Sequence, residues 1–489
     1  MLNIKLERES NTSLFMQICL QIKYFIDNNI LKANDKLPST RKLASFLNVN
    51  RTTVYKAYEE LWALGYIESK PGGYATVRKR FRQENNSQKE SARKIDWTQK
   101  WGEYAGRIQS PEKKKTEFRK KKELIDFTPL SPDPDYLPQE TFRKIVNNIL
   151  RSSEHSLLNY GDPWGNESLR EVIATQMQLH AITASTDNII ITNGAQNAIE
   201  LIIKLITNKG ASIIIENPTY SAILPLFKFY GLHIIPVPVN DEGIDLRELE
   251  RKIKIHSPRF IYTMPNFQNP TGITTSQSHR EKLLQIAERY EVPIIEDGFI
   301  EEMKYFGKNI LPVKSMDKKG LVFYVGTFSK VLFPGLRIGW IVAEKQCIDQ
   351  LAAIKQVSEI SGNNFTQAAL AQFCKSGFYE KQLKMIHKIY RKRMYTALKI
   401  LRENLTNNKV RYSKPIGGYT IWFELINLQI QEDEFIGLLQ QNGVAVTPGS
   451  LSYEKDAPDI YFRISIAHRN EDEIQQGLLK IINILNHLK

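Results

Sequence analysis

The chain has 489 residues, which exceeds the size of most single domains, so two or more domains are expected. A hydrophobic content of 42% is enough for packed cores, and no apolar run reaches membrane-spanning length. The N-terminal segment MLNIKLERES lacks the apolar core of a signal peptide. The three cysteines (Cys19, Cys347 and Cys374) have neither disulfide nor metal-binding spacing. These features predict a protein of the reducing cytoplasm.

The net charge of +14 is distributed unevenly along the chain. Residues 1–122 contain 26 Lys and Arg against 13 Asp and Glu, whereas the remaining residues contain 41 against 40. A basic N-terminal segment on a nearly neutral body predicts a nucleic-acid-binding module joined to a second domain. A solubilising basic tail would have the same composition.

Residues 1–78 have the pattern of three helices and a hairpin. Apolar residues recur at helical spacing over 14–28, again after the capping residue Ser39, and again over 52–64. Gly65 ends the last helix, and two short strands follow at 66–68 and 74–77. This order predicts a winged helix-turn-helix.

The stretch LPSTRKLASFLNVNRTTVYKAYEELWALGYIESKPGGYATV resembles the GntR-type DNA-binding domain along its whole length. The resemblance implies that the helix beginning near Arg51 enters the major groove of DNA. The residues then expected to contact bases or phosphates are Arg41, Arg51, Thr52, Thr53 and, on the wing, Lys70. The alternative is that these arginines are ordinary exposed charges.

The hydrophobic period disappears over residues 79–122. RKRFRQENNSQKESARK and PEKKKTEFRKKKE are polar and strongly basic, which predicts a flexible linker. This linker could be merely solvated, or it could lie along DNA and add sequence-independent affinity that weakens with salt.

Residues 123–489 alternate helices with short apolar strands. This alternation predicts an α/β domain whose mainly parallel sheet is covered on both faces. The expected strands are 188–191, 212–215, 233–236, 260–263, 293–295 and 321–325, with helices such as 196–206 and 275–290 between them. Active sites in such folds gather at the carboxyl ends of the strands.

Polar motifs follow several of these strands. TNGAQ (192–196) opens a helix, whose free N–H groups suit a phosphate. ENPTY (216–220) places an aromatic ring where it could stack on a planar cofactor, and PNFQNPTG (265–272) supplies amide donors. Asp297 ends a fourth strand, and a carboxylate there can keep a pyridine nitrogen protonated. Each motif alone could be a plain turn or a helix cap.

The stretch YVGTFSKVLFPGLRIGW (324–340) delivers one lysine, Lys330, at a strand end. Its amine can form a Schiff base with an aldehyde, while two hydroxyls and Arg337 hold a phosphate. This arrangement suits pyridoxal 5'-phosphate (PLP), although a solvated surface lysine would look similar.

Together these motifs resemble fold-type I aminotransferases, and the whole chain resembles a MocR-type regulator, in which a GntR-type domain precedes an aminotransferase-like domain. The resemblance implies that Lys330 forms the internal aldimine, Asp297 pairs with the pyridine nitrogen and Asn269 donates to the cofactor 3-oxygen. Tyr220 would stack on the ring. The phosphate would be held by Ala195, Gln196, Thr327, Ser329 and Arg337.

Two further residues are implied by the same resemblance. The segment YFRISI (461–466) carries Arg463, which would bind the carboxylate of an effector, a task that suits bidentate arginine. The segment NYGDPWG (159–165) carries Tyr160, which would reach the site of a partner subunit.

One position departs from the family pattern. Phe299 stands where a tyrosine shortly after the aspartate would donate a second hydrogen bond to the 3-oxygen. The missing hydroxyl removes a donor that tunes the imine pKa, which puts efficient transamination in doubt but leaves cofactor binding intact.

Three hypotheses follow. The first is a homodimeric PLP-dependent transcription regulator that senses an amino acid, an amine or PLP itself and binds a promoter with two half-sites. The second is an active aminotransferase with an accessory DNA-binding module. The third is an empty dimerisation scaffold, against which the full set of cofactor residues argues.

Overall fold

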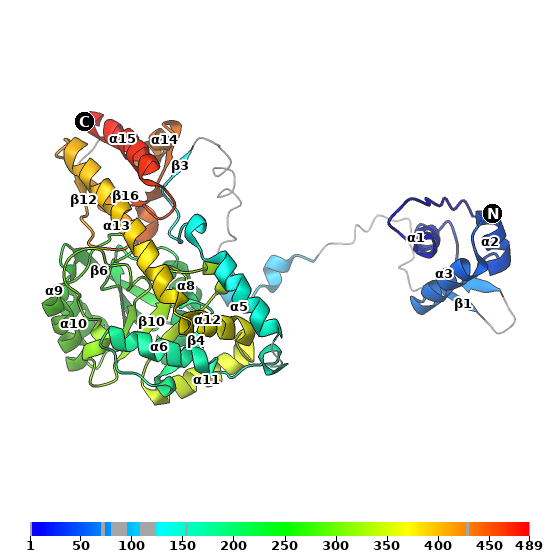
Figure 1. Cartoon of the computed structure of the whole chain (residues 1–489), viewed down its shortest axis with the longest axis horizontal. Helices are drawn as coiled ribbons and strands as arrows, with labels where there is room; N and C mark the ends of the chain where they lie inside the picture. Colours follow the sequence, from blue (N-terminus) through cyan, green and yellow to red (C-terminus); the bar gives the residue numbers. More distant parts are fainter. Residues whose placement is uncertain are drawn as a thin grey trace. The chain divides into compact units, whose positions relative to one another are not determined.

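The computed structural model describes residues 2–69, 74–79, 95–107, 124–151, 155–426 and 430–488. They form two compact units, Met1–Asp96 and Trp97–Lys489 (Figure 1). Within these ranges no helix combines the length and apolar character that crossing a bilayer requires.

The first unit is a winged helix-turn-helix, as predicted. Ser39 accepts a hydrogen bond from the Lys42 backbone N–H and so caps the second helix, and Asn50 caps the third through the Thr52 N–H at 3.1 Å. The hairpin pairs Ile67 with Val77. Its elements are α1 (Leu14–Asp27), α2 (Thr40–Leu47), α3 (Arg51–Ala63), β1 (Ile67–Ser69) and β2 (Ala75–Val77).

The second unit is built on an eight-stranded sheet with the order β4-β11-β10-β9-β8-β5-β6-β7. The pairs from β10 through β6 are parallel, which confirms the predicted mainly parallel sheet. β11 runs antiparallel to both of its neighbours and was not expected as a strand. The strands are β4 (Ile189–Thr192), β5 (Ser212–Asn217), β6 (His233–Asn240), β7 (Gly243–Ile244), β8 (Ile261–Thr263), β9 (Ile294–Asp297), β10 (Val322–Thr327) and β11 (Gly339–Val342).

Helices cover both faces of this sheet because its strands are apolar on both sides. Ile213 and Ile215 of β5 pack on one face with α7 (Ala195–Ile206), α8 (Ile223–Phe229) and α11 (Lys345–Glu359). Ile214, between them, packs on the other face with α9 (Leu246–His256) and α10 (Gln277–Arg289). That second face also receives α6 (Glu167–Leu179), α12 (Asn364–Lys375) and α13 (Phe378–Asn404), with α5 (Gln139–Arg151) outside them.

The C-terminal part adds a four-stranded antiparallel sheet, which the sequence analysis did not separate from the main domain. Its strand order is β12-β13-β16-β15, and α13 lies beside α15 next to this sheet (Figure 1). Its elements are β12 (Val410–Tyr412), β13 (Thr420–Leu425), α14 (Glu432–Gln441), β15 (Thr447–Pro448), β16 (Ile460–Ser465) and α15 (Glu471–His487). β14 (Val444–Ala445) pairs separately with β3 (Ile125–Asp126).

Part of the predicted linker packs against the second unit. The short helix α4 (Glu103–Gly106) places the Tyr104 ring 5.1 Å from that of Phe229, and the Arg107 Nη1 donates to the Phe229 carbonyl at 2.9 Å. Glu103 pairs with Lys209. Residues 97–107 are therefore bound to the second unit, whereas 80–94 and 108–123 lie outside the described residues, and a flexible linker there stays a prediction.

A buried ion pair joins the segment before α5 to α13. The Asp133 carboxylate accepts from Arg393 Nη2 at 2.8 Å, and Arg393 Nη1 also donates to the carbonyl of Ala467 at 2.6 Å. Both charged residues are buried. The pair thus joins three segments that are distant in sequence.

We expect Asp133→Ala to lower the free energy of unfolding of the second unit by about 3–5 kcal/mol, because Arg393 would keep a buried charge without its partner. Denaturant unfolding followed by far-UV circular dichroism measures this loss. Asp135→Ala, at an exposed position two residues away, is the matched control and should leave stability near that of the wild type.

Candidate functional site

The site forms where parallel strands end. β5, β8, β9 and β10 are consecutive in the sheet and parallel, so the segments that follow them emerge at one edge. Asp297 ends β9 and pairs in register with Val325 of β10, two residues before Thr327. The sheet therefore brings together motifs that are up to about a hundred residues apart.

Lys330 lies just beyond β10, and its Nζ donates to the Leu130 carbonyl at 3.2 Å. Burial, together with the nearby Arg463 and Arg337, lowers the pKa of Lys330 to about 8, while Asp297 opposes this effect. The Tyr419 hydroxyl donates to the Lys330 carbonyl at 2.6 Å and holds its backbone. The unprotonated fraction of this amine near neutral pH is thus much larger than that of a free lysine side chain, although the protonated form still predominates.

Asp297 is buried and only half satisfied. Its Oδ2 accepts from the Tyr262 hydroxyl at 2.7 Å, whereas its Oδ1 is buried without a hydrogen-bond partner. Burial raises the pKa of Asp297 to about 6, against the opposing effects of Tyr262, Lys330 and the Phe299 backbone N–H. An unpaired buried carboxylate oxygen is costly unless a donor occupies the place next to it.

The loop that carries Asn269 is held by a buried carboxylate. Glu216, on β5, accepts from Thr263 Oγ1 at 2.5 Å and from Gln268 Nε2 at 3.1 Å. The same Gln268 amide donates to the Pro218 carbonyl at 2.7 Å. Burial raises the pKa of Glu216 to about 7. This network fixes the loop next to Asn269, which is itself buried.

Arg463 reaches the same place from β16. Its Nη1 donates to Asn269 Oδ1 at 3.1 Å, and its Nη2 donates to the Thr128 carbonyl and to Thr447 Oγ1, both at 3.0 Å. Its Nε is buried without a partner. Burial lowers the pKa of Arg463 to about 10, with Tyr220 opposing. Three of the five N–H donors are thus used, and the guanidinium keeps the Nε–H and one Nη1–H free for a ligand.

A second group of donors gathers at the start of α7. Arg337 Nη2 donates to the Asn193 carbonyl at 3.1 Å, directly before this helix. Gly194 has φ of +85°, and a Cβ there would lie 2.6 Å from Arg337 Nη2, so only glycine admits this approach. Ala195 and Gln196 form the first turn, and Gln196 Oε1 is buried and unpaired. A helix N-terminus beside a guanidinium suits a phosphate.

The remaining predicted cofactor residues border these groups. Thr327 Oγ1 donates to the Ile338 carbonyl at 3.0 Å and accepts from the Ser329 N–H at 3.2 Å, which shapes the turn before Lys330. Burial raises the pKa of Tyr220, and Asp297, Arg463 and Arg337 act on its hydroxyl electrostatically, which places it among them.

Two residues add no polar side-chain contact to this site within the described ranges, although the Phe299 backbone N–H donates to Asp297. Phe299 packs against the cores on both sides of the sheet with a ring that offers no hydroxyl. Tyr160 is 81% exposed and makes no contact with the site within the described part of the chain.

In the first unit, Arg51 and Thr52 open α3, and both are exposed with Arg41. Arg51 and Tyr55 border a hollow of about 650 Å³ that also includes Thr40 and Tyr74. Thr53 is half-buried, and Lys70 lies outside the described residues. Tyr55 and Tyr74 are exposed at this surface, and the sequence did not predict either of them as part of it.

Sequence reasoning also missed Tyr262 and Glu216. Tyr262 lies within a fully buried strand, where an aromatic residue is ordinarily part of the core, so nothing local indicates that its hydroxyl bonds Asp297. Among the described residues there is no group of three or more His, Cys, Asp or Glu side chains placed to hold a metal ion.

Comparison with known proteins identifies a family for each of the two units. Residues 131–481 match the family "Aminotransferase class I and II", and residues 15–77 match "Bacterial regulatory proteins, gntR family". The uncharacterized HTH-type transcriptional regulator YdeL of Bacillus subtilis is 30% identical over 480 residues, covering 97% of each chain.

The similar enzymes match a smaller share of the chain. Aromatic-amino-acid aminotransferase 1 of Thermococcus litoralis is 32% identical over 359 residues, covering 72% of this chain and 85% of that protein. The crystal structure of Pyrococcus horikoshii kynurenine aminotransferase is similar with a TM-score of 0.75 and 30% identity, covering 80% of this chain and 98% of that one. The match to YdeL, in contrast, runs through both units. The chain therefore belongs to the MocR-type regulators, in which a gntR-family DNA-binding domain precedes an aminotransferase class I and II domain.

Proposed function

We propose that this protein is a PLP-dependent transcriptional regulator that senses an amino compound or PLP itself. One observation carries the proposal: a single chain contains both a gntR-family domain, here called the head, and a candidate cofactor site. In that site Lys330 has a lowered pKa, and the nearby Asp297 has a carboxylate oxygen without a hydrogen-bond partner. When bound, PLP supplies an aldehyde that reacts with amines and a pyridine ring that accepts electrons.

The residues present fit this cofactor. The unpaired Asp297 Oδ1 is the acceptor that a protonated pyridine nitrogen needs, and Lys330 is the amine for covalent attachment. Asn269 would bind the 3-oxygen, and Tyr220 would stack on the ring. The phosphate would be held by Ala195, Gln196, Thr327, Ser329 and Arg337, around the N-terminus of α7.

We propose Arg463 as the residue that recognises an effector carboxylate. Its Nε is buried without a partner, although its other nitrogens are held by Asn269, Thr128 and Thr447. A carboxylate placed there would accept from the remaining N–H donors of a group that is already oriented. If the cofactor itself is the effector, Arg463 has no part in sensing.

The regulator is proposed to act as a homodimer with two heads, which implies a promoter with two half-sites. The exposed Tyr160 would contact the partner subunit's cofactor site. In each head Arg41, Arg51, Thr52, Thr53 and Lys70 would contact DNA. Effector binding would change the relative populations of two arrangements of the heads.

An active aminotransferase is the second candidate, favoured by the 32% identity to the Thermococcus litoralis enzyme. Phe299 weighs against it, because the position offers no hydroxyl to donate to the cofactor 3-oxygen. The chain keeps the Lys330 amine, the Asp297 carboxylate and the phosphate-binding residues, but it lacks the hydroxyl donor. This combination suits a sensor better than a catalyst.

Lys330→Ala should abolish the visible absorbance band of the cofactor-bound protein, because no other amine is placed beside Asp297 in the described residues. Spectra of the purified protein with added PLP measure this. Lys480→Ala, which removes an exposed amine from α15, should keep the band. A wild-type protein without the band in excess PLP would contradict the proposal.

The rate at which the cofactor-free protein binds PLP covalently should rise with pH through about 8 and then level off. The unprotonated amine attacks the aldehyde, and burial lowers the pKa of Lys330 to about 8. Stopped-flow absorbance gives the profile. A free amine such as N-acetyl-lysine amide, with a pKa of about 10.4, should still gain rate above pH 9; a protein profile identical to it would contradict the lowered pKa.

Arg51→Ala should weaken binding to the gene's own upstream DNA by about 1–3 kcal/mol, because an arginine at the start of α3 can bind guanine or phosphate. Fluorescence anisotropy at fixed salt measures this. Lys32→Ala removes one exposed positive charge elsewhere in the head and should have a smaller effect. Equal losses in the two variants would mean that Arg51 contributes only charge.

A further inference from the structure

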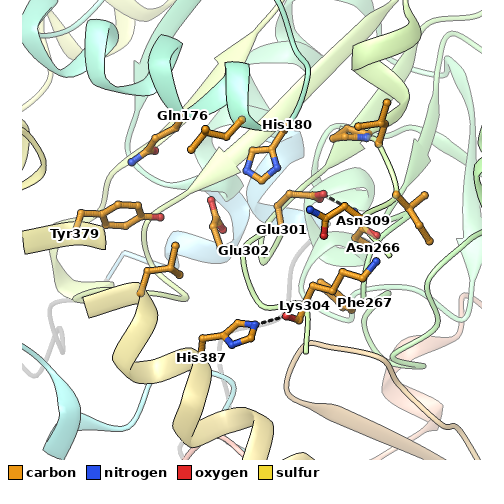
Figure 2. Close-up of a pocket in the computed structure, with 15 residues that line it drawn as sticks. Gln176, His180, Asn266, Phe267, Glu301, Glu302, Lys304, Asn309, Tyr379 and His387 are labelled. Carbon is orange, nitrogen blue, oxygen red and sulfur yellow. Dashed lines mark hydrogen bonds between the residues drawn. The ribbon is translucent and has the colours of Figure 1, made fainter. Parts of the chain in front are cut away.

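A second pocket lies away from the cofactor residues. It has a volume of about 340 Å³ and is bordered by the end of α6, the beginning of α13 and the segments around Asn266 and Glu301–Pro312. Figure 2 shows polar side chains from each of these segments around it. A pocket of this size accommodates a small organic molecule.

Gln176, on α6, is the clearest sign that the pocket has a ligand. It is only 8% exposed, yet both its amide oxygen and its amide nitrogen are buried without a hydrogen-bond partner. Figure 2 shows this side chain at the end of the pocket near Tyr379 and Glu302. A buried amide with neither atom satisfied is destabilising unless a bound molecule supplies the missing partners.

Two carboxylates in the same pocket give it an acidic character. Glu301 accepts from Asn266 Nδ2 at 2.5 Å, and Arg280 in turn donates to Asn266 Oδ1, also at 2.5 Å. Glu302 differs, because no other side chain in the described ranges donates to its carboxylate. Burial raises the pKa of Glu302, with His180 opposing this effect. Glu302 therefore has a hydrogen bond from its own backbone N–H but none from another side chain of the described residues.

The one ammonium at the pocket does not compensate both carboxylates. Lys304 Nζ is buried without a hydrogen-bond partner, and burial lowers the pKa of Lys304. Figure 2 shows its Nζ directed away from Glu302. The Glu302 end of the pocket thus favours a positive charge, whereas the rest of the lining includes apolar side chains from Leu179, Ile310, Leu311, Pro312 and Leu383.

We propose that this pocket is a second small-molecule site, which binds a small aliphatic ammonium compound. The ammonium group donates to Glu302 and to the Gln176 amide oxygen, and the alkyl part packs on the apolar wall formed by Leu179 and Leu383. Such a ligand supplies both a charge partner for the carboxylate and a donor for the amide.

The pocket shares its backbone with the cofactor residues. Asn266 stands three positions before Asn269 on one loop, and Glu302 stands five positions after Asp297 on another. Occupancy of the pocket is chemically independent of Lys330. The proposal therefore does not rest on the proposed function, and it can fail or succeed separately.

The test uses n-butylamine, whose ammonium group carries three N–H donors, on protein treated with borohydride so that no aldehyde is left to condense with the amine. Titration calorimetry on the full-length protein with PLP bound should show saturable binding at one site per chain. Glu302→Gln should weaken this binding about tenfold or more, because a hydrogen-bonded charge pair is lost. Glu281→Gln, an exposed carboxylate on α10, is the control and should bind as the wild type does.

A second variant separates binding from folding. Gln176→Leu should weaken amine binding severalfold while the thermal midpoint stays equal to or above that of the wild type, because an unsatisfied buried amide is removed. The proposal is overturned if the wild type shows no saturable binding, or if both variants bind the amine as tightly as the wild type. The proposal would also be overturned if the wild type bound butyrate but not the amine, and if Lys304→Met removed the butyrate binding.

Discussion

The structure depends on one geometric constraint: neighbouring parallel strands end at the same edge of the sheet. β10, β9, β8 and β5 are consecutive, so the turn before Lys330, the Asp297 carboxylate, the Asn269 loop and the ENPTY segment all emerge there. None of these segments needs a contact with another to reach that edge. The sheet sets the approximate positions of these segments, and contacts among their side chains then determine the final geometry of the site.

The ends of these strands bring several ionisable side chains together in a buried place. Lys330, Asp297, Arg463 and Glu216 each have a pKa moved toward the neutral form by burial, and partial compensation comes from Tyr262, Gln268, Asn269 and backbone groups. The atoms that remain unpaired are informative, because a native fold satisfies nearly all of its buried polar atoms. Asp297 Oδ1, Arg463 Nε and Gln196 Oε1 lie where a cofactor and an acid would bind, and the Gln176 amide lies in the second pocket.

Much of this could be predicted from sequence because the decisive signals are local. Strands such as 212–215 are short runs of β-branched residues, Ser39 and Asn50 are caps, and each cofactor motif directly follows its strand. What could not be predicted depends on pairing between distant segments. The position of β11 between β4 and β10 depends on hydrogen bonds between strands, which the hydrophobic periodicity of the sequence does not reveal. The same holds for the Tyr262–Asp297 bond, for the packing of residues 97–107 and for the grouping of Gln176 with Glu302.

The position of β16 has a consequence for how the protein is made. Arg463 contacts Thr128 and Asn269, segments that precede it by 335 and 194 residues, and β16 itself is completed only at Ser465. Chains emerge from the ribosome N-terminus first, and distant contacts form late because loop closure must precede them. The head can therefore fold, and can encounter DNA, while the pocket around Lys330 still lacks Arg463. A nascent regulator of this construction gains its DNA-binding surface before it gains its complete sensor.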